Sequence, residues 1–508
     1  MQRPKAYILV SDDPNEIQKL SAYTAKTLSS ILKTCLGPRA MQKMVLTKMN
    51  SIELTNDGNS ILREMDVSHP SARCLIELSQ TQDDECGDGT TSVMLLASEL
   101  LNKMVPLLGQ SHPVHLCRSL AKAKDLCLEH LNTIAVEAKE EELLSIVSSS
   151  VSTKLCTVLK IPIPEIALKA AKMIMFDSKI DIKNDIKIDK ILGAFDETEI
   201  IEGVLIEKDL IHSQMRKKIE NPSILVLDSP LEYKKGESVT NMEFSHKEAF
   251  SKALKMEEDQ IRAMCQKIIE TGADLVVTEK GICDLALSIL YENNITAIRR
   301  VKKSDATRIA KTTGATIMNR IEDISSSHLG SAGLFEYVKI GKEYYFKLSK
   351  CSNPRAVSVV LRGPTKDILA EIERNFMDAI KVAKNALMCP KLVPGAGATE
   401  MCLSILLSKA AKEEDKKIFA QASEALKIIP SILSSNSGFG CTLEKLDQLE
   451  KKHEVSHYFG IDGISGEVAD ARNIVMEPMV VKTQCIKSVF ECVMQLLRVD
   501  GIIESRSK

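Results

Sequence analysis

Gly87-Asp88-Gly89-Thr90-Thr91-Ser92, followed at once by the apolar run Val93-Met94-Leu95-Leu96-Ala97, predicts a phosphate-binding loop that opens a buried helix. The glycines allow a tight turn and a close approach of the backbone to a ligand. The first N–H groups of the helix lack partners within it, and with the Thr and Ser hydroxyls they suit a phosphate chain. A carboxylate beside a phosphate needs a cation between them, so Asp88 predicts a bound Mg²⁺. The first interpretation is a magnesium-nucleotide site, although the same residues could form a simple turn before a core helix.

The composition is that of an ordinary globular chain with several domains. The 508 residues predict about two to four domains at roughly 100 to 200 residues each. Apolar residues make up 44% and charged residues 27%, whereas aromatic residues reach only 4% and Trp is absent. A formal net charge of -2 leaves no basic field for nucleic acid, and few aromatic rings are available to stack on bases. We therefore expect no nucleic-acid partner.

Cysteine usage and hydropathy favour a cytoplasmic protein. The 14 cysteines are scattered and form no C-x-x-C pair, so the sequence indicates neither a zinc ribbon nor a disulfide framework. Reduced thiols of this kind fit the cytosol. The apolar run Ala6–Val10 is short and ends before Asp12, and no segment approaches about 20 apolar residues. No export signal and no membrane span are expected.

The pattern of the sequence changes along the chain. A helix is expected from Pro14 to about Cys35 and a strand, turn and strand at Lys43–Thr55. Helical periodicity resumes from Ile61, dominates Ser92 to about Ala138 and returns after the glycine loop that begins at Val393. Residues 140–202 mix short helices with alternating apolar and charged positions, and from Gly203 apolar strand runs such as Leu275–Val277 alternate with helices. Helical ends that flank an α/β middle are typical of one domain interrupted by others. The sequence thus predicts an α+β multidomain protein.

One segment of the middle part differs from its surroundings. Glu243–Glu258 is densely charged and compatible with a helix. Its apolar residues are few, namely Phe244, Phe250, Leu254 and Met256. We interpret it as a helical arm that stands off the body of its domain.

Two acids and a second glycine loop stand out, each with a plain alternative. Asn56-Asp57-Gly58 is a tight turn that holds a carboxylate at a strand end, but it is also a common hairpin turn. Asp378 lies on the polar side of a helix predicted at 366–387, where a solvated carboxylate is the usual case. Gly395-Ala396-Gly397 could approach a ligand or could be only a permissive turn. No Walker motif and no strand-associated G-x-G-x-x-G is present, so a nucleotide site must be of another kind.

Two further motifs are better explained by structural roles than by metal binding or catalysis. His453-Glu454-Val455-Ser456-His457 matches H-E-x-x-H, which on a long helix binds zinc. Here it follows Lys451-Lys452 and runs directly into Tyr458-Phe459-Gly460, which indicates an exposed helix end. Cys86 has no His nearby in the sequence, so it is interpreted as a packing residue and not as a nucleophile.

Taken together, these pieces resemble the nucleotide-site signatures of the group II chaperonins in order and spacing. The matching pieces are Leu36-Gly37-Pro38, Thr55-Asn56-Asp57-Gly58, Gly87–Ser92, the helix of Asp378 and Val393–Glu400. The resemblance covers essentially the whole chain. Leu227–Ser238, Met256–Glu258 and Ile295–Val301 also resemble one subunit type of the eukaryotic cytosolic chaperonin, TRiC/CCT.

The resemblance implies a chaperonin fold of three domains. A mainly helical equatorial ATP-binding domain would comprise residues 1–139 and 390–508. A small α/β intermediate hinge domain would comprise 140–202 and 362–389. An α/β apical domain for substrate binding would comprise 203–361, with a helical lid protrusion at about 238–262, where the charged arm falls.

The resemblance also implies a role for each site residue. Asp57 and Asp378 would position and activate the attacking water, and Asp88 would bind Mg²⁺. Around the phosphates of ATP it places Gly37, Pro38, Gly89, Thr90, Thr91 and Ser92. Thr153 and Lys154 would sense the γ-phosphate, and the residues around adenine and ribose would be Gly395, Gly397, Gly463, Glu477 and Lys482. Ala396 stands where the family commonly has glycine, and alanine forbids an easy positive φ there.

The implied function is that of an ATP-dependent chaperonin subunit. It would bind, enclose and fold non-native polypeptides such as actin and tubulin, and ATP hydrolysis would drive lid closure. Its partners would be paralogous subunits in a hetero-oligomeric double ring. One alternative is a free-standing ATP-dependent phosphotransferase with the same loop. Another is a chaperonin subunit with little hydrolysis, which the presence of Asp57, Asp88 and Asp378 argues against.

Overall fold

The computed structural model describes residues 6–8, 15–47, 52–176, 179–212, 214–233, 247–351, 354–410 and 415–505. These residues form two compact units. The first comprises Met1–Leu168 and Arg374–Lys508, and the second comprises Lys169–Glu373. The first unit is therefore built from both ends of the chain, with the second inserted between them. The division into three domains stays a prediction, and both unit boundaries fall inside the segments expected for the hinge domain.

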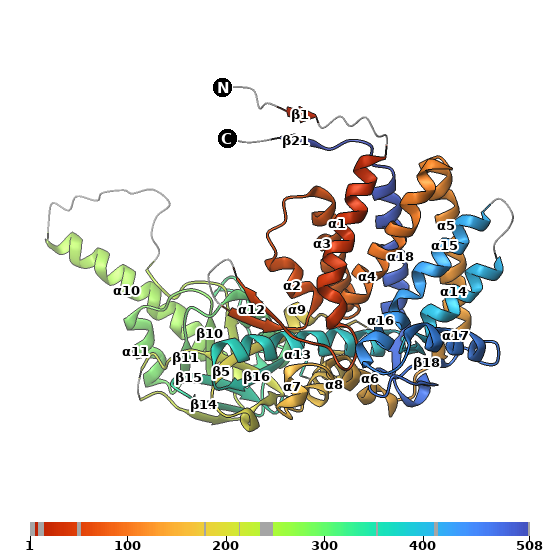
Figure 1. Ribbon diagram of the computed structural model, residues 1–508. Helices are drawn as coiled ribbons and strands as arrows, with labels where there is room; N and C mark the ends of the chain where they lie inside the picture. The colour runs from red at the N-terminus through yellow and green to blue at the C-terminus, as the bar shows by residue number, and fades with distance from the viewer. Residues whose placement is uncertain are drawn as a thin grey trace. The chain divides into compact units, whose positions relative to one another are not determined.

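The first unit is a bundle of helices around one apolar core. Its helices are α1 (Glu16–Leu32), α2 (Gly58–Glu64), α3 (Pro70–Cys86), α4 (Thr90–Met104), α5 (Pro113–Ile134), α6 (Glu142–Val151), α7 (Leu155–Val158), α14 (Ala398–Ala410), α15 (Lys416–Leu426), α16 (Ile428–Ser437), α17 (Thr442–His453) and α18 (Met479–Leu497). Helix α4 packs against α1, α3, α15 and α18, and Figure 1 shows α4 between α1 and α18. The helix that the opening sequence predicts is thus the centre of this unit.

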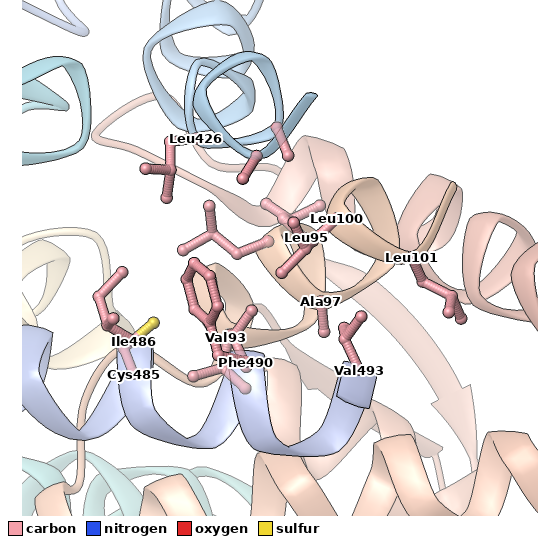
Figure 2. Packing of buried hydrophobic residues seen from close by; sticks show 14 of the residues in the cluster. Val93, Leu95, Ala97, Leu100, Leu101, Leu426, Cys485, Ile486, Phe490 and Val493 are labelled. Atoms are coloured by element: carbon pink, nitrogen blue, oxygen red, sulfur yellow. The ribbon is translucent and has the colours of Figure 1, made fainter. Parts of the chain in front are cut away.

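Burial on several sides explains why α4 lacks a continuous polar face. Figure 2 shows Val93, Leu95 and Ala97 packed close to Phe490 and Val493 of α18, and all five are at most 1% exposed. The continuous segment Thr90–Gly109 has the length and hydropathy to cross a membrane, which the sequence analysis did not expect. Because 61% of an apolar 18-residue window of that segment is buried, it also fits a core helix.

Short strands join distant parts of the first unit. Strand β17 (Lys391–Pro394) pairs with β20 (Met476–Pro478) and β4 (Val136–Glu137), so Val393 lies opposite Glu477. The other antiparallel pairs are β1 (Ala6–Ile8) with β21 (Ile503–Ser505), β2 (Lys43–Leu46) with β3 (Ile52–Thr55), and β18 (Phe459–Ile461) with β19 (Val468–Asp470). The β17–β20 pair brings the second glycine loop next to Glu477.

The described residues of the second unit form three sheets. A mainly parallel sheet has the order β11 (Thr296–Ile298), β10 (Leu275–Thr278), β9 (Ser223–Leu227) and β12 (Ile317–Met318), with β13 (Gly330–Ser331) antiparallel to β9. The helices α10 (Lys247–Glu270), α11 (Asp284–Glu292) and α12 (Lys303–Thr313) connect its successive strands. The other sheets are β7 (Gly203–Glu207), β15 (Glu343–Ser349), β14 (Leu334–Ile340) and β8 (Lys218–Glu220), and β5 (Ile186–Leu192), β16 (Val357–Gly363) and β6 (Glu199–Ile201). The predicted α/β pattern is confirmed for this unit.

The predicted charged arm is only partly within the described residues. Residues 243–246 of Glu243–Glu258 lie outside them, as do 238–242 of the expected protrusion. From Lys247 the segment is helical, and α10 continues to Glu270, further than the charged pattern. Leu254 and Met256 are 45% and 69% exposed on it. The helix is confirmed over these residues, and its role as a lid stays a prediction.

Two helices cross the boundary between the units. They are α8 (Ile163–Ile174) and α13 (Lys366–Met388). The sequence predicts the second at 366–387, so its extent is confirmed within one residue. Ile372, Phe376 and Ile380 are completely buried on its apolar face, as the periodicity predicts. The part that carries Asp378 belongs to the first unit.

Candidate functional site

The loop between α3 and α4 depends on two glycines with left-handed backbone. Gly87 ends α3 with φ +69°, and Gly89 precedes α4 with φ +81°, which residues with a Cβ rarely adopt. Gly89 N–H donates to Asp88 Oδ1 at 2.7 Å, and Gln82 Nε2 donates to the Asp88 carbonyl at 3.0 Å. The loop therefore presents the start of α4, with its free N–H groups and hydroxyls, in the geometry that suits a phosphate.

Asp57 lies beside this loop at the start of α2. As the N-cap, its Oδ2 accepts from Ser60 N at 2.9 Å and from Ser60 Oγ at 2.7 Å. Thr90 Oγ1 donates to Asp57 Oδ1 at 3.4 Å. Burial opposes ionisation, but Lys154 and the Ser60 hydrogen bonds outweigh it and hold the pKa of Asp57 below its usual value. Asp57 is thus a fixed, ionised acceptor.

Asp378 forms an ion pair with Lys154 and is not the solvated carboxylate of the plain alternative. Lys154 Nζ donates to Asp378 Oδ2, and the side chains are 12% and 14% exposed, respectively. Burial raises the pKa of Asp378 to about 7, although Lys154 opposes this. Burial also disfavours the Lys154 ammonium, but Asp378 and Asp57 raise its pKa overall. A carboxyl with a pKa near neutrality can exchange a proton during a reaction.

Asp88 suits the cation that the sequence predicts. Burial raises the pKa of Asp88, and the Gly89 N–H and Lys154 do not compensate. A divalent cation at this carboxylate would restore its ionised form. Among the described residues no group of three or more His, Cys, Asp and Glu side chains could hold a metal on its own. Asp88 alone can serve Mg²⁺, which commonly uses one or two carboxylates together with substrate phosphates and water.

A cavity of about 690 Å³ joins these groups, within the usual size of sites for small ligands. It is lined by every predicted site residue except Gly395, namely Gly37, Pro38, Asp57, Asp88, Gly89, Thr90, Thr91, Ser92, Thr153, Lys154, Asp378, Gly397, Gly463, Glu477 and Lys482. Gly395 does not line the cavity. A Cβ added to Gly395 would lie 2.7 Å from Glu477 Oε1. The hydroxyls of α6 on this wall were not predicted from the sequence; they belong to Ser145, Ser148, Ser149 and Ser150. The run Ser148-Ser149-Ser150 is the sequence feature that could have indicated these hydroxyls.

At another part of the wall, Lys482 binds two carboxylates. Its Nζ is 2.7 Å from Glu400 Oε1 and 2.9 Å from Glu477 Oε2. Burial raises the pKa of Glu477, although Lys482 opposes this. Glu400 is 2% exposed, and its Oε2 has no hydrogen-bond partner among the described residues. The sequence analysis gave Glu400 no role, because the pattern cannot show which carboxylates share one lysine.

Comparison with known protein families agrees with this geometry. Residues 28–507 match the family model described as the TCP-1/cpn60 chaperonin family. The chain belongs to this family. The predicted resemblance to group II chaperonins is thereby confirmed. Chaperonins of this family are ATPases, so the predicted ATPase activity is confirmed, and the free-standing phosphotransferase is not supported.

Individual relatives specify the kind of chaperonin subunit. The chain is 55% identical over 518 residues to T-complex protein 1 subunit gamma of Encephalitozoon cuniculi (strain GB-M1), covering 100% of both chains. It is 42% identical over 509 residues to the human protein of that name, covering 97% of this chain and 93% of the relative. It is 40% identical over 533 residues to the Saccharomyces cerevisiae protein, covering 100% of both. The stretches 227–238, 256–258 and 295–301 predict this gamma type, and the comparisons agree.

Ala396 adopts a backbone conformation that is unfavourable for alanine. Its φ is +54°, in the left-handed region, although the sequence analysis stated that alanine forbids an easy positive φ here. The residue is held in place because its carbonyl accepts from Ile461 N–H at 2.9 Å and because it is only 9% exposed. Such a conformation costs about 1–2 kcal/mol for a residue with a Cβ. The loop keeps its shape at a cost in stability.

The remaining motifs of the chaperonin have the structural roles that the sequence predicts. Helix α17 ends at His453, and His453 Nε2 donates to the Phe459 carbonyl at 2.7 Å, so the two His of H-E-x-x-H do not share a helix. Val455 between them is 88% exposed. All 14 cysteines are free thiols, and burial raises the pKa of Cys86 to about 12, as expected for a packing residue.

Replacing Ala396 with glycine should stabilise the chain. Glycine adopts a φ near +54° without the steric penalty that alanine has there. Part of this gain in stability is lost because glycine gives the unfolded chain more conformational freedom. We expect the free energy of unfolding to rise by about 0.5–1 kcal/mol, or the Tm by roughly 1–4 °C, in chemical or thermal denaturation. Ala420→Gly, at an exposed position inside α15, is the control and should lower stability by about 1 kcal/mol. A lower Tm for Ala396→Gly would contradict the assignment of strain.

Proposed function

We propose that the chain is an ATP-hydrolysing subunit of a cytosolic, hetero-oligomeric double ring that encloses and folds non-native polypeptides such as actin and tubulin. The observation that carries the proposal is the convergence of three carboxylates, Asp57, Asp88 and Asp378, on the glycine loop before α4. The names of the relatives support the proposed assembly, because each relative is named as one subunit of a T-complex protein. Phosphoryl transfer to water requires charge neutralisation, which Lys154 and a cation at Asp88 would provide, and a positioned nucleophile, which Asp57 and Asp378 would hold.

The phosphates of ATP would lie at the start of α4. The free N–H groups there and the hydroxyls of Thr90, Thr91 and Ser92 would bind phosphate oxygens. A Mg²⁺ held by Asp88 would neutralise phosphate charge. Glu477 and Lys482 would lie near adenine and ribose, and Thr153 beside Lys154 would lie near the γ-phosphate. This assignment follows the predicted roles and the position of each residue on the cavity wall.

Asp57 and Asp378 would share the handling of the attacking water. Asp57 is ionised and fixed by Ser60, so it would accept a hydrogen bond from the water and orient it. Asp378, with a pKa of about 7, would take up the proton. Lys154 contacts Asp378, and its ammonium would also attract the γ-phosphate. Asp378 could then act as a base only when Lys154 is drawn toward the nucleotide.

Native mass measurement on the endogenous complex tests the assembly. We expect the chain to co-purify in a very large double ring with paralogous subunits, and chemically unfolded actin or tubulin to be retained by that ring in the absence of ATP. A complex without ATP-dependent release of these polypeptides would leave the proposed substrates unsupported. A monomer or a small oligomer would contradict the proposal outright.

Asp378→Ala should abolish hydrolysis but not ATP binding. Removing a general base lowers turnover by about 10²–10⁴-fold, whereas the loop before α4 remains intact. Single-turnover hydrolysis is measured in assembled rings whose other subunits carry the equivalent substitution, so that the signal comes from this chain. Asp447→Ala on α17, where the side chain is 63% exposed, is the matched control. Undiminished single-turnover hydrolysis by Asp378→Ala would rule out its role as base.

Hydrolysis by this subunit should depend on pH through Asp378. The pKa of its carboxyl is about 7, and a base must be ionised to take up a proton. We therefore expect kcat/KM for ATP, which reports the groups of the unliganded subunit, to rise as the pH increases through about 7 and to level off above it. Asp378→Asn should leave only a low rate without this inflection. A wild-type rate that does not change between roughly pH 6 and 8 would exclude Asp378 as the titrating group.

A further inference from the structure

A polar cluster outside the cavity joins α2, α3 and α13. Lys381 Nζ donates to Asp83 Oδ1 at 2.9 Å and to the Asp83 carbonyl at 2.8 Å. Asn59 Nδ2 donates to Asp83 Oδ2 at 2.7 Å. The Lys381 and Asp83 side chains are only 17% and 20% exposed, and neither lines the cavity. Asp83 is thus the shared acceptor of two donors from two other helices.

Each helix that meets at Asp83 also positions one of the three acids of the site. Asn59 lies in the first turn of α2, whose N-cap is Asp57. Asp83 lies in the last turn of α3, directly before the loop of Asp88. Lys381 follows Asp378 by one turn on α13, and residues spaced by three share a helix face. The cluster is therefore the point where the elements carrying the acids are joined.

Lys381 also covers the glycine loop directly. A Cβ on Gly87 would lie 2.5 Å from Lys381 Cβ and 2.6 Å from its Cδ, so the aliphatic stem rests on the loop backbone. The Asp83 carbonyl accepts from Gly87 N–H at 2.8 Å as well as from the Lys381 ammonium, which completes the end of α3. One turn further, Asn385 Nδ2 donates to the Cys86 carbonyl at 3.0 Å. Helix α13 is held against the loop by these contacts.

We propose that Lys381 and Asp83 are positioning residues that fix Asp378 relative to Asp57 and Asp88. The inference rests on the proposed role of Asp378 as the base. Neither residue touches the nucleotide cavity, so they act through the placement of α13. A base misplaced by about 1 Å can lower a rate by roughly 10²-fold, whereas ATP would still be bound by the loop. The cluster thus governs turnover and not affinity.

Two substitutions separate this role from general folding. Lys381→Met keeps the stem over Gly87 but removes the ammonium, and Asp83→Asn keeps the shape of the side chain but removes its charge. In rings whose other subunits are inactive, we expect each to lower kcat by about 10-fold or more, with the Kd for ATP changed by less than about 2-fold. The double variant should be no slower than the slower single variant, because the two changes share the Lys381–Asp83 contact and Asp83→Asn by itself already alters the Asn59 hydrogen bond.

Lys427→Met is the matched control because it removes an ion pair of equal length, 2.9 Å, between Lys427 and Glu450 in the same unit. It should leave kcat unchanged. Native mass measurement of each ring shows whether the variant has assembled, and if Lys381→Met does not assemble, Asp83→Asn decides the result. Lys381→Arg retains the charge and should recover part of the kcat lost in Lys381→Met.

The outcomes distinguish this inference from the proposed function. If Asp378→Ala retains full hydrolysis, the proposed base is wrong, whatever the cluster variants do. If Asp378→Ala is inactive but Lys381→Met and Asp83→Asn keep the wild-type kcat, the positioning role is wrong and the base stands. If the cluster variants lose ATP affinity as much as kcat, the cluster maintains the cavity as a whole, and the proposal is overturned.

Discussion

The confinement of three carboxylates with one ammonium in a buried cavity governs the chemistry of this site. Asp57, Asp88 and Asp378 repel one another, and Lys154 offsets only part of their charge. Burial strengthens that repulsion because less water screens it. Burial, and to a smaller extent the charge of Asp57, raises the pKa values of Asp88 and Asp378, whereas Asp57, which accepts hydrogen bonds from Ser60, stays ionised. Such a cavity favours a ligand that brings a cation with it, as a magnesium nucleotide does.

The two halves of the site are held by different forces. The loop before α4 is fixed by the apolar core of the first unit, where Val93 and Leu95 are completely buried. The apolar residues of α13 do not belong to that core cluster. Among the described residues, α13 contacts the end of α3 and the loop through Lys381 and Asn385, and its Asp378 pairs with Lys154 of the turn after α6. A hydrogen bond contributes about 0.5–1.5 kcal/mol net, so these contacts can form and break while the core remains intact.

Much of this arrangement could be predicted from the sequence, because it depends on local pattern and on the order of the motifs. The glycine loop, the extent of α13 and the insertion of an α/β part between helical ends all follow from periodicity and turn residues. Asp57 and Asp378 were ambiguous alone, since a turn or an exposed helix face explains each equally well. The pairing of Lys381 with Asp83 and of Lys482 with Glu400 could not be predicted, because these contacts join residues far apart in the chain.

Ala396 shows that the local propensity of a residue can also predict its backbone conformation wrongly. Propensity alone excludes a positive φ for alanine, yet the loop keeps it because the Ile461 N–H and the surrounding buried residues fix the backbone. The penalty of about 1–2 kcal/mol is small compared with the stabilisation from the apolar core that imposes this conformation. A rigid core therefore tolerates strain at the cavity wall, and the same rigidity keeps the start of α4 in one place. The polar contacts that join α13 to this region, Lys381 with Asp83 and Asn385 with the Cys86 carbonyl, lie outside that core, and in the proposed positioning role they determine whether Asp378 stands correctly relative to the other two acids.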